Sequence, residues 1–128
     1  MNLAILKQLR ANSRASWQQI GQRVHLSGQA VATRVQNMQE QGIISGFTIR
    51  ENHEPKHFIT VFMESSDFSG FENMLKNTED VEAAYKVSGE GCYQVILRDR
   101  PANGLETFLN EILKYGRYRV SSSIRCVK

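Results

Sequence analysis

Apolar residues recur at helical spacing through the first part of the chain. The spacing predicts a first helix over residues 3–10, ending before a short polar connection. Ser16 stands three residues before Gln19, and this arrangement is a capping box: the hydroxyl accepts from a backbone N–H and the amide reaches back. A second helix is therefore expected from Trp17 to about His25.

A third helix is expected between Ser27 and Gly42. The Ser27 hydroxyl is a second N-cap candidate, and Gly42 is a candidate for a left-handed C-cap. Val31, Val35 and Met38 follow at spacings of four and three, which gives the helix one apolar side. Because the connection from the second helix is so short, the two helices form a helix-turn-helix by spacing.

The pattern changes after this helix. Residues 43–49 are rich in β-branched and aromatic side chains and predict a strand. The polar segment 51–56, which holds Pro55, is the best linker candidate in the chain. We therefore divide the chain into a helix-turn-helix domain over residues 1–46, a strand and linker over 47–56, and a second domain over 57–128.

The second domain alternates strand and helix patterns. Strands are expected over 57–64, 81–87, 92–98 and 120–127, helices over 68–75 and 105–113, and a turn over 88–91. The order β-α-β-β-α-β predicts an α+β fold, a ferredoxin-like split βαβ sandwich of four antiparallel strands with both helices on one face. The bare face of such a sheet needs a cover, and a second copy of the chain is the expected cover. Phe62, Tyr85 and Tyr93 are the candidate apolar residues for that surface.

Charge separates the two parts of this 128-residue chain, whose formal net charge is +3. Residues 1–50 carry six basic residues against one acidic residue, whereas residues 51–128 carry ten basic against twelve acidic residues. A basic first part favours a polyanionic partner, because phosphates attract Lys and Arg and release counterions on contact. A solvated helical surface that is merely basic is the alternative. The length excludes a multidomain enzyme.

The polar side of the third helix is suited to double-stranded DNA. It presents hydrogen-bonding groups with almost no negative charge, which can lie in a major groove and reach base edges. The candidate groove residues are Ser27, Gln29, Thr33, Arg34 and Asn37, with Arg14 and Arg23 as candidate phosphate contacts. A three-helix bundle with a solvated polar face is the alternative interpretation of the same pattern.

Several motifs together resemble the Lrp/AsnC, or feast/famine, family of bacterial and archaeal transcription regulators. The most specific is the segment 41–47, Gln-Gly-Ile-Ile-Ser-Gly-Phe, which is similar to the family's exit from the recognition helix. Segments 12–16 and 26–35 also match, and the likeness covers nearly the whole chain. The resemblance implies a RAM-type second domain and homodimers formed through it, often assembled into larger octamer-like rings. It also implies an effector site, commonly for an amino acid, between those domains.

The resemblance also assigns an effector turn. The family's effector loop is similar to residues 87–93, so the expected small-molecule site is Ser88, Gly89, Glu90 and Gly91. Glycines there let backbone N–H groups approach a carboxylate. Cys92 stands where the family usually carries an aspartate, and a thiol cannot hold an ammonium group by a charge-assisted bond.

Two other functions share parts of this pattern. One is an architectural protein that coats DNA and has no effector. The other is a small dimeric α/β-barrel enzyme, which shares the sandwich but usually needs a histidine or other base inside it. The serine run 121–123 is expected to be an exposed strand face, not a nucleophile, and no enzyme activity is expected.

The remaining signals predict neither a metal nor a cofactor. His53 and His57 have helical metal-ligand spacing, but Pro55 lies between them and makes a helix improbable. Cys92 and Cys126 are expected to be buried, inert thiols. No run approaches the roughly 20 apolar residues that span a bilayer, so we expect a cytoplasmic protein without a membrane partner.

Overall fold

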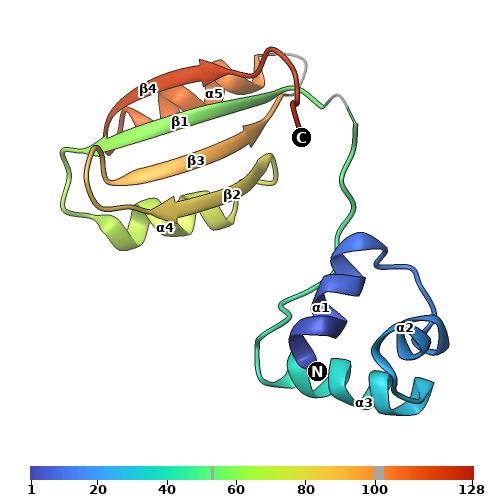
Figure 1. Ribbon diagram of the computed structural model, residues 1–128. Helices are drawn as coiled ribbons and strands as arrows, with labels where there is room; N and C mark the ends of the chain where they lie inside the picture. Colours follow the sequence, from blue (N-terminus) through green and yellow to red (C-terminus); the bar gives the residue numbers. More distant parts are fainter. Residues whose placement is uncertain (53, 100–102) are drawn as a thin grey trace. The chain divides into compact units, whose positions relative to one another are not determined.

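The computed structural model describes residues 1–52, 54–99 and 103–128, and it divides the chain into two compact units, Met1–Arg50 and Glu51–Lys128 (Figure 1). Each unit has its own hydrophobic core. His53 of the considered histidine pair lies outside the described residues.

Unit 1 contains the three expected helices, α1 (Asn2–Ala11), α2 (Trp17–Val24) and α3 (Gly28–Glu40). The capping box at the start of α2 is confirmed: Ser16 Oγ accepts from the Gln19 N–H at 3.1 Å, and Gln19 Oε1 accepts from the Ser16 N–H at 3.0 Å. One apolar side of each helix faces a common core. That core is Ile5, Leu9, Ile20, Val24, Val31, Val35 and Met38.

The strand predicted over residues 43–49 is wrong. The structure assigns no strand to these residues, and three of their large apolar side chains are exposed: Ile43 (55%), Phe47 (52%) and Ile49 (79%). Strand propensity is largely a preference for packing on a pleated, paired surface. None of the four described strands pairs with this segment, so its β-branched residues remain in the connection after α3.

Unit 2 has the expected order of elements. These are β1 (Lys56–Met63), α4 (Phe68–Lys76), β2 (Val81–Lys86), β3 (Tyr93–Arg98), α5 (Gly104–Ile112) and β4 (Gly116–Ser122). The four strands form one antiparallel sheet in the order β2-β3-β1-β4, and both helices lie on the same face of it (Figure 1). The predicted α+β sandwich is confirmed.

The last strand starts four residues earlier and ends five residues earlier than the expected 120–127. It pairs with β1 from Met63↔Gly116 to His57↔Ser122, and the Ser123 N–H still donates to Lys56 O at 2.8 Å. Since β1 begins at Lys56, later residues have no strand to pair with, and Ile124 is 99% exposed. The exposed Cys126 belongs to this tail, so the expectation that both cysteines are buried is wrong for Cys126, whereas Cys92 is half-buried.

The core of unit 2 lies between the sheet and its two helices. It consists of Ile59, Val61, Phe71, Leu75, Tyr93, Val95, Leu97, Phe108 and Ile112. Tyr93 was expected on the bare face, but its register partner is the buried Val61, so its ring faces the helices and is 2% exposed. The bare face instead presents Phe58 (43% exposed) and Tyr85 (60%) beside the half-buried Phe62.

Candidate functional site

A close approach of backbone to backbone builds the helix-turn-helix of unit 1. A Cβ on Gly21 of α2 would lie only 2.3 Å from Leu26 O, so a side chain at this position has no room. His25 ends α2 in the left-handed region (φ 61°), and Ser27 Oγ then caps α3 by accepting from the Ala30 N–H at 3.1 Å. These contacts fix the turn and the direction in which α3 leaves it.

The outer side of α3 is polar and exposed. Gln29, Thr33 and Asn37 are all exposed, as expected for residues that can reach base edges. Gln36 is exposed beside them, and its Nε2 donates to Glu40 Oε1 at 3.3 Å. The helix therefore offers amides and a hydroxyl along its length, with a carboxylate only at its end.

Two of the expected groove residues have partners within unit 1. Arg34 is half-buried at the flank of α3, where its Nη1 donates to Asn2 Oδ1 of α1 at 3.3 Å. The hydroxyl of Ser27 is used in the helix cap. The Ser27 cap was expected from the sequence, whereas the contact of Arg34 was not, because it joins residues 32 positions apart.

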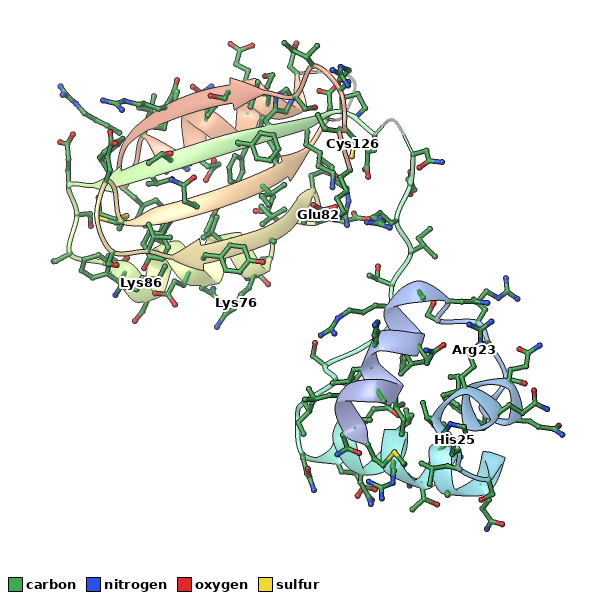
Figure 2. All side chains as sticks on the ribbon, in the orientation of Figure 1. Arg23, His25, Lys76, Glu82, Lys86 and Cys126 are labelled. Carbon is green, nitrogen blue, oxygen red and sulfur yellow. The ribbon has the colours of Figure 1, made fainter. Side chains whose placement is uncertain are left out.

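The basic residues of unit 1 are not neutralised within it. Arg14 and Arg23 are exposed, and Figure 2 shows Arg23 extending from the helical unit. No salt bridge joins two residues of the described segment 1–50, and Glu40 is its only acidic residue. The surface of unit 1 therefore carries an uncompensated positive charge, which attracts phosphates.

The turn Ser88–Gly91 joins β2 to β3 and is largely exposed. Gly89 (φ 97°) and Gly91 (φ 82°) adopt conformations that favour glycine, and a Cβ on Gly91 would lie 2.6 Å from Thr60 Cγ2. Glu90 forms an ion pair with Arg119 of β4. The two glycines, which have no side chains, leave room for a ligand to approach the backbone N–H groups of the turn. The carboxylate of Glu90, in contrast, already has a cationic partner in Arg119.

A buried histidine is a feature that sequence reasoning missed. His57 Nδ1 lies 2.7 Å from Ser122 Oγ, and its Nε2 lies 2.9 Å from Asp99 Oδ1, so one member of the serine run 121–123 contacts a histidine. His57 lies in β1, Ser122 in β4, and Asp99 directly follows β3. Because both ring nitrogens are engaged, the arrangement ties these three segments together.

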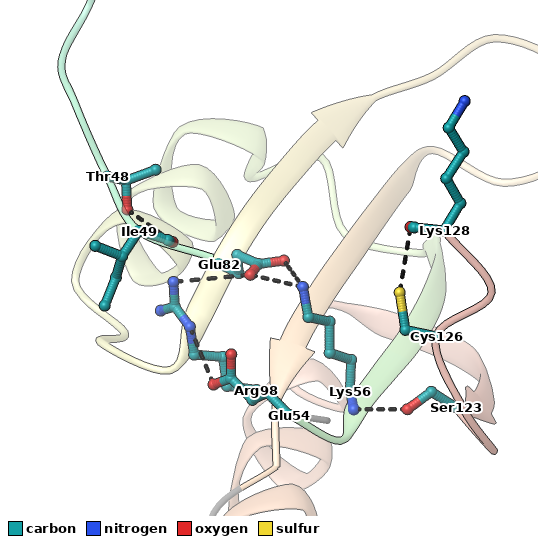
Figure 3. A network of polar contacts seen from close by, with 9 residues as sticks. All are labelled: Thr48, Ile49, Glu54, Lys56, Glu82, Arg98, Ser123, Cys126 and Lys128. Atoms are coloured by element: carbon teal, nitrogen blue, oxygen red, sulfur yellow. Dashed lines mark hydrogen bonds and ion pairs between the residues drawn. The ribbon is translucent and has the colours of Figure 1, made fainter. Parts of the chain in front are cut away.

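Ion pairs occupy one end of the bare sheet face. Lys56 Nζ lies 2.8 Å from Glu82 Oε1, and Arg98 lies between Glu82 (3.8 Å) and Glu54 (3.4 Å) (Figure 3). All four side chains are partly shielded from solvent. This network links the start of β1 to β2 and β3. The aromatic residues of the bare face do not take part in it.

Comparisons with known proteins cover both units. A family model described as winged helix-turn-helix DNA-binding matches residues 2–45, and one described as the Lrp/AsnC ligand binding domain matches residues 56–128. The transcriptional regulator LrpB of Bacillus subtilis is 30% identical over 133 residues, covering 100% of this chain and 89% of LrpB. LrpA of Bacillus subtilis is 32% identical, covering 91% of this chain and 90% of LrpA.

Solved structures agree with this result. A feast or famine regulatory protein from Mycobacterium tuberculosis, complexed with L-methionine, has a TM-score of 0.83 and 26% identity, covering 98% of this chain and 91% of that one. Among the described residues, no helix is long and apolar enough to cross a membrane. The ligand-binding model matches more than half of the chain, and the likeness to LrpB extends over its whole length. The chain therefore belongs to the Lrp/AsnC family of helix-turn-helix, DNA-binding transcriptional regulators.

Proposed function

We propose that the protein is a sequence-specific regulator that places α3 in the major groove of double-stranded DNA. The observation that carries this proposal is the exposed amide and hydroxyl side of a capped helix, on a unit whose positive charge is uncompensated. Gln29, Thr33 and Asn37 face solvent and reach base edges. Arg34 reads bases from the flank of the helix, and Ser27 fixes the helix start beside the groove.

Arg14 and Arg23 are the proposed phosphate contacts. Both are exposed and free of salt bridges within unit 1, so their guanidinium groups are available to the DNA backbone. Such contacts position a protein on DNA without selecting a sequence. Residues 47–56 are the proposed connection between the DNA-binding unit, 1–46, and the dimerisation and effector unit, 57–128.

Two arginine variants are expected to separate base reading from phosphate contact. Arg23→Ala should weaken binding to all DNA sequences alike and reduce the slope of affinity against salt by about one unit. Arg34→Ala should instead change the preference among operator sequences, because a base contact is lost. Mobility shift on genomic fragments at two salt concentrations measures both effects.

The same assay tests the proposed function as a whole. Sequence-selective binding supports a regulator, whereas uniform coating of all fragments would indicate an architectural protein. If Arg34→Ala binds every site as the parent does, Arg34 has no role in the groove. The proposal includes no catalytic activity, since the relatives are named as transcriptional regulators, and it places the protein in the cytoplasm with its DNA.

The proposed active form is a two-fold homodimer made by the bare sheet faces. Phe58 and Tyr85 would otherwise leave apolar rings in water on the sheet face opposite α4 and α5. One α3 helix also contacts too few bases for specificity, so two copies on two half-sites are required. Assembly of dimers into an octamer-like ring belongs to the same proposal.

Light scattering of the full chain at micromolar concentration is expected to give twice the mass of one chain or a higher even multiple. Phe58→Asp should shift the protein toward monomer, because it places a charge in the proposed interface. Leu113→Asp is the matched control: Leu113 is 57% exposed at the end of α5, on the helix side of the sheet. A parent protein that is monomeric at this concentration contradicts the proposal.

The turn Ser88–Gly91 is the proposed effector site, and an amino acid or another small metabolite is the proposed effector. The related mycobacterial protein was solved with L-methionine, and the positive-φ glycines let N–H groups reach a carboxylate. Because Cys92 stands where the family usually carries an aspartate, and Glu90 is paired with Arg119, the turn itself holds no free carboxylate for an ammonium group. Gly89→Val is the variant that perturbs this turn, since it forces a branched residue to φ 97°.

A further inference from the structure

A cavity of about 410 Å³ lies in unit 1 between α1 and α2. Its apolar wall consists of Ala11, Ala15 and the buried Ile20, and the two alanines leave the space open because their side chains end at Cβ. No residue of α3 is among the described residues that line it. The cavity is therefore separate from the helix that is proposed to enter the major groove, and its size is that of a small-ligand site.

Two amide side chains of the cavity are held in place by backbone bonds. Asn12 Oδ1 accepts from the Arg14 N–H at 3.1 Å, and Gln19 Oε1 accepts from the Ser16 N–H at 3.0 Å. Neither NH2 group donates to another described residue. Since the oxygens are engaged and the NH2 groups are not, both amides are available to a ligand chiefly as donors.

The charged group of this cavity is a cation. Arg23 lies in the last turn of α2 and forms no salt bridge with a described residue. Gln8 and Gln22 add two further amides to the lining. Glu40, the only acidic residue of segment 1–50, is not part of it. A guanidinium and four amides without a carboxylate attract an anion.

A phosphate group matches these donors better than a carboxylate does. Asn12 ends α1, whereas Gln19, Gln22 and Arg23 belong to α2, so the donors approach a ligand from two helices. A phosphate ester has three strong acceptor oxygens in a tetrahedral arrangement, and a carboxylate has its two oxygens in one plane. A guanidinium also pairs with phosphate through two parallel bonds.

We propose that this cavity binds a small phosphorylated ligand, namely a phosphate monoester. The phosphate oxygens pair with Arg23 and accept from the amides of Asn12 and Gln19, while the apolar part of the ligand packs on Ile20. Binding itself does not depend on the proposed function. Its consequence does rest on that function: because Arg23 is also a proposed contact to the DNA backbone, ligand and DNA compete for one guanidinium.

Phenyl phosphate and phenylmalonate are the matched probes, because each carries one apolar ring and about two negative charges at pH 8. Calorimetric titration of the full chain at fixed ionic strength is expected to show binding of phenyl phosphate. Phenylmalonate should bind about tenfold more weakly or worse, since its planar carboxylates meet fewer of the donors. Equal binding of the two probes, or no binding of phenyl phosphate, overturns the proposal.

Filling the cavity locates the site without removing a polar group. Ala11→Leu places a larger apolar side chain in the space and should weaken binding of phenyl phosphate about tenfold or more. Ala4→Leu is the matched control, because Ala4 is exposed on the same helix and outside the lining, and it should leave binding unchanged.

A second pair of variants tests the donors. Asn12→Asp keeps the acceptor for the Arg14 N–H but replaces a donor with a negative charge, so binding should again weaken about tenfold or more. Gln18→Glu changes the charge of unit 1 equally from an exposed position outside the lining, and should have a much smaller effect. Binding that survives both Ala11→Leu and Asn12→Asp overturns this site.

Mobility shift tests the competition with DNA. Phenyl phosphate should reduce DNA binding of the parent more than phenylmalonate does at equal ionic strength, and Ala11→Leu should abolish this difference. An equal loss with both acids contradicts the competition at Arg23. Phenyl phosphate binding by a protein that shifts no DNA supports the cavity site and contradicts the proposed function, whereas selective DNA binding without phenyl phosphate binding does the reverse.

Discussion

Gly21→Ala is expected to unfold unit 1 at temperatures where the parent unit is folded, and to abolish DNA binding. The added Cβ would lie 2.3 Å from Leu26 O and 3.2 Å from Leu26 C, and both atoms belong to the backbone, so no side-chain rotation relieves the clash. Overpacking costs about 1–3 kcal/mol and occasionally more. A unit of this size holds only about 2.5–7.5 kcal/mol in total. Moving α2 from the turn also separates Ile20 and Val24 from the core they share with α3.

Thermal unfolding monitored by the fluorescence of Trp17 measures this effect. Trp17 is the only tryptophan in the chain and lies in α2, so its signal follows unit 1 alone. Gly46→Ala is the matched control, because a Cβ at Gly46 meets nothing within 4 Å and its φ lies outside the left-handed region. A Gly21→Ala protein with the parent's melting temperature would show that the turn tolerates a side chain, contrary to the close approach.

Local patterns were sufficient to predict most of the fold. Helices α2 and α3 of unit 1 have side-chain caps within three residues of their starts, as in Ser16 with Gln19, so short-range signals define them. Short-range signals were not sufficient for two strand predictions, the one over residues 43–49 and the last strand. Residues 43–49 have strand-like side chains but no partner among the described strands. Residues 116–119 form part of β4, although Arg117 and Arg119 are not typical strand residues and the sequence pattern did not predict a strand there. Pairing, which is a long-range property, decides both cases.

The candidate site was less predictable than the fold for the same reason. Exposure of Gln29 and Thr33 follows from helical periodicity and was expected. The contact of Arg34 with Asn2 joins residues 32 positions apart, and that of His57 with Ser122 joins residues 65 positions apart. Tyr93 was placed on the wrong face because strand alternation gives two faces but does not say which one meets the helices. These contacts depend on tertiary packing between distant segments, which local sequence patterns do not reveal.

Phe71→Ala is expected to destabilise unit 2 by about 3–5 kcal/mol, the usual cost of truncating a buried phenylalanine. Phe71 is 0% exposed, and its ring centre lies 4.9 Å from that of Tyr93 and 5.3 Å from that of Tyr115. Its removal leaves a void between α4 and the sheet, where two rigid rings cannot collapse to fill it. Phe68→Ala is the matched control on the same helix, because Phe68 is 38% exposed and its contact with the Lys86 ammonium contributes only about 0.5–1 kcal/mol.

The two signals of the full chain distinguish this loss from the loss in Gly21→Ala. Far-ultraviolet circular dichroism follows both units, whereas Trp17 fluorescence follows unit 1. In Phe71→Ala the dichroism transition of unit 2 should move to lower denaturant concentration while the Trp17 transition stays in place. Both transitions moving together would mean that the two units unfold as one cooperative body. If only the unit 2 transition moves, unit 1 stays folded and each α3 helix should still contact DNA. Affinity for the whole operator should nevertheless fall, because the proposed sheet-to-sheet dimer holds the two α3 helices on their half-sites.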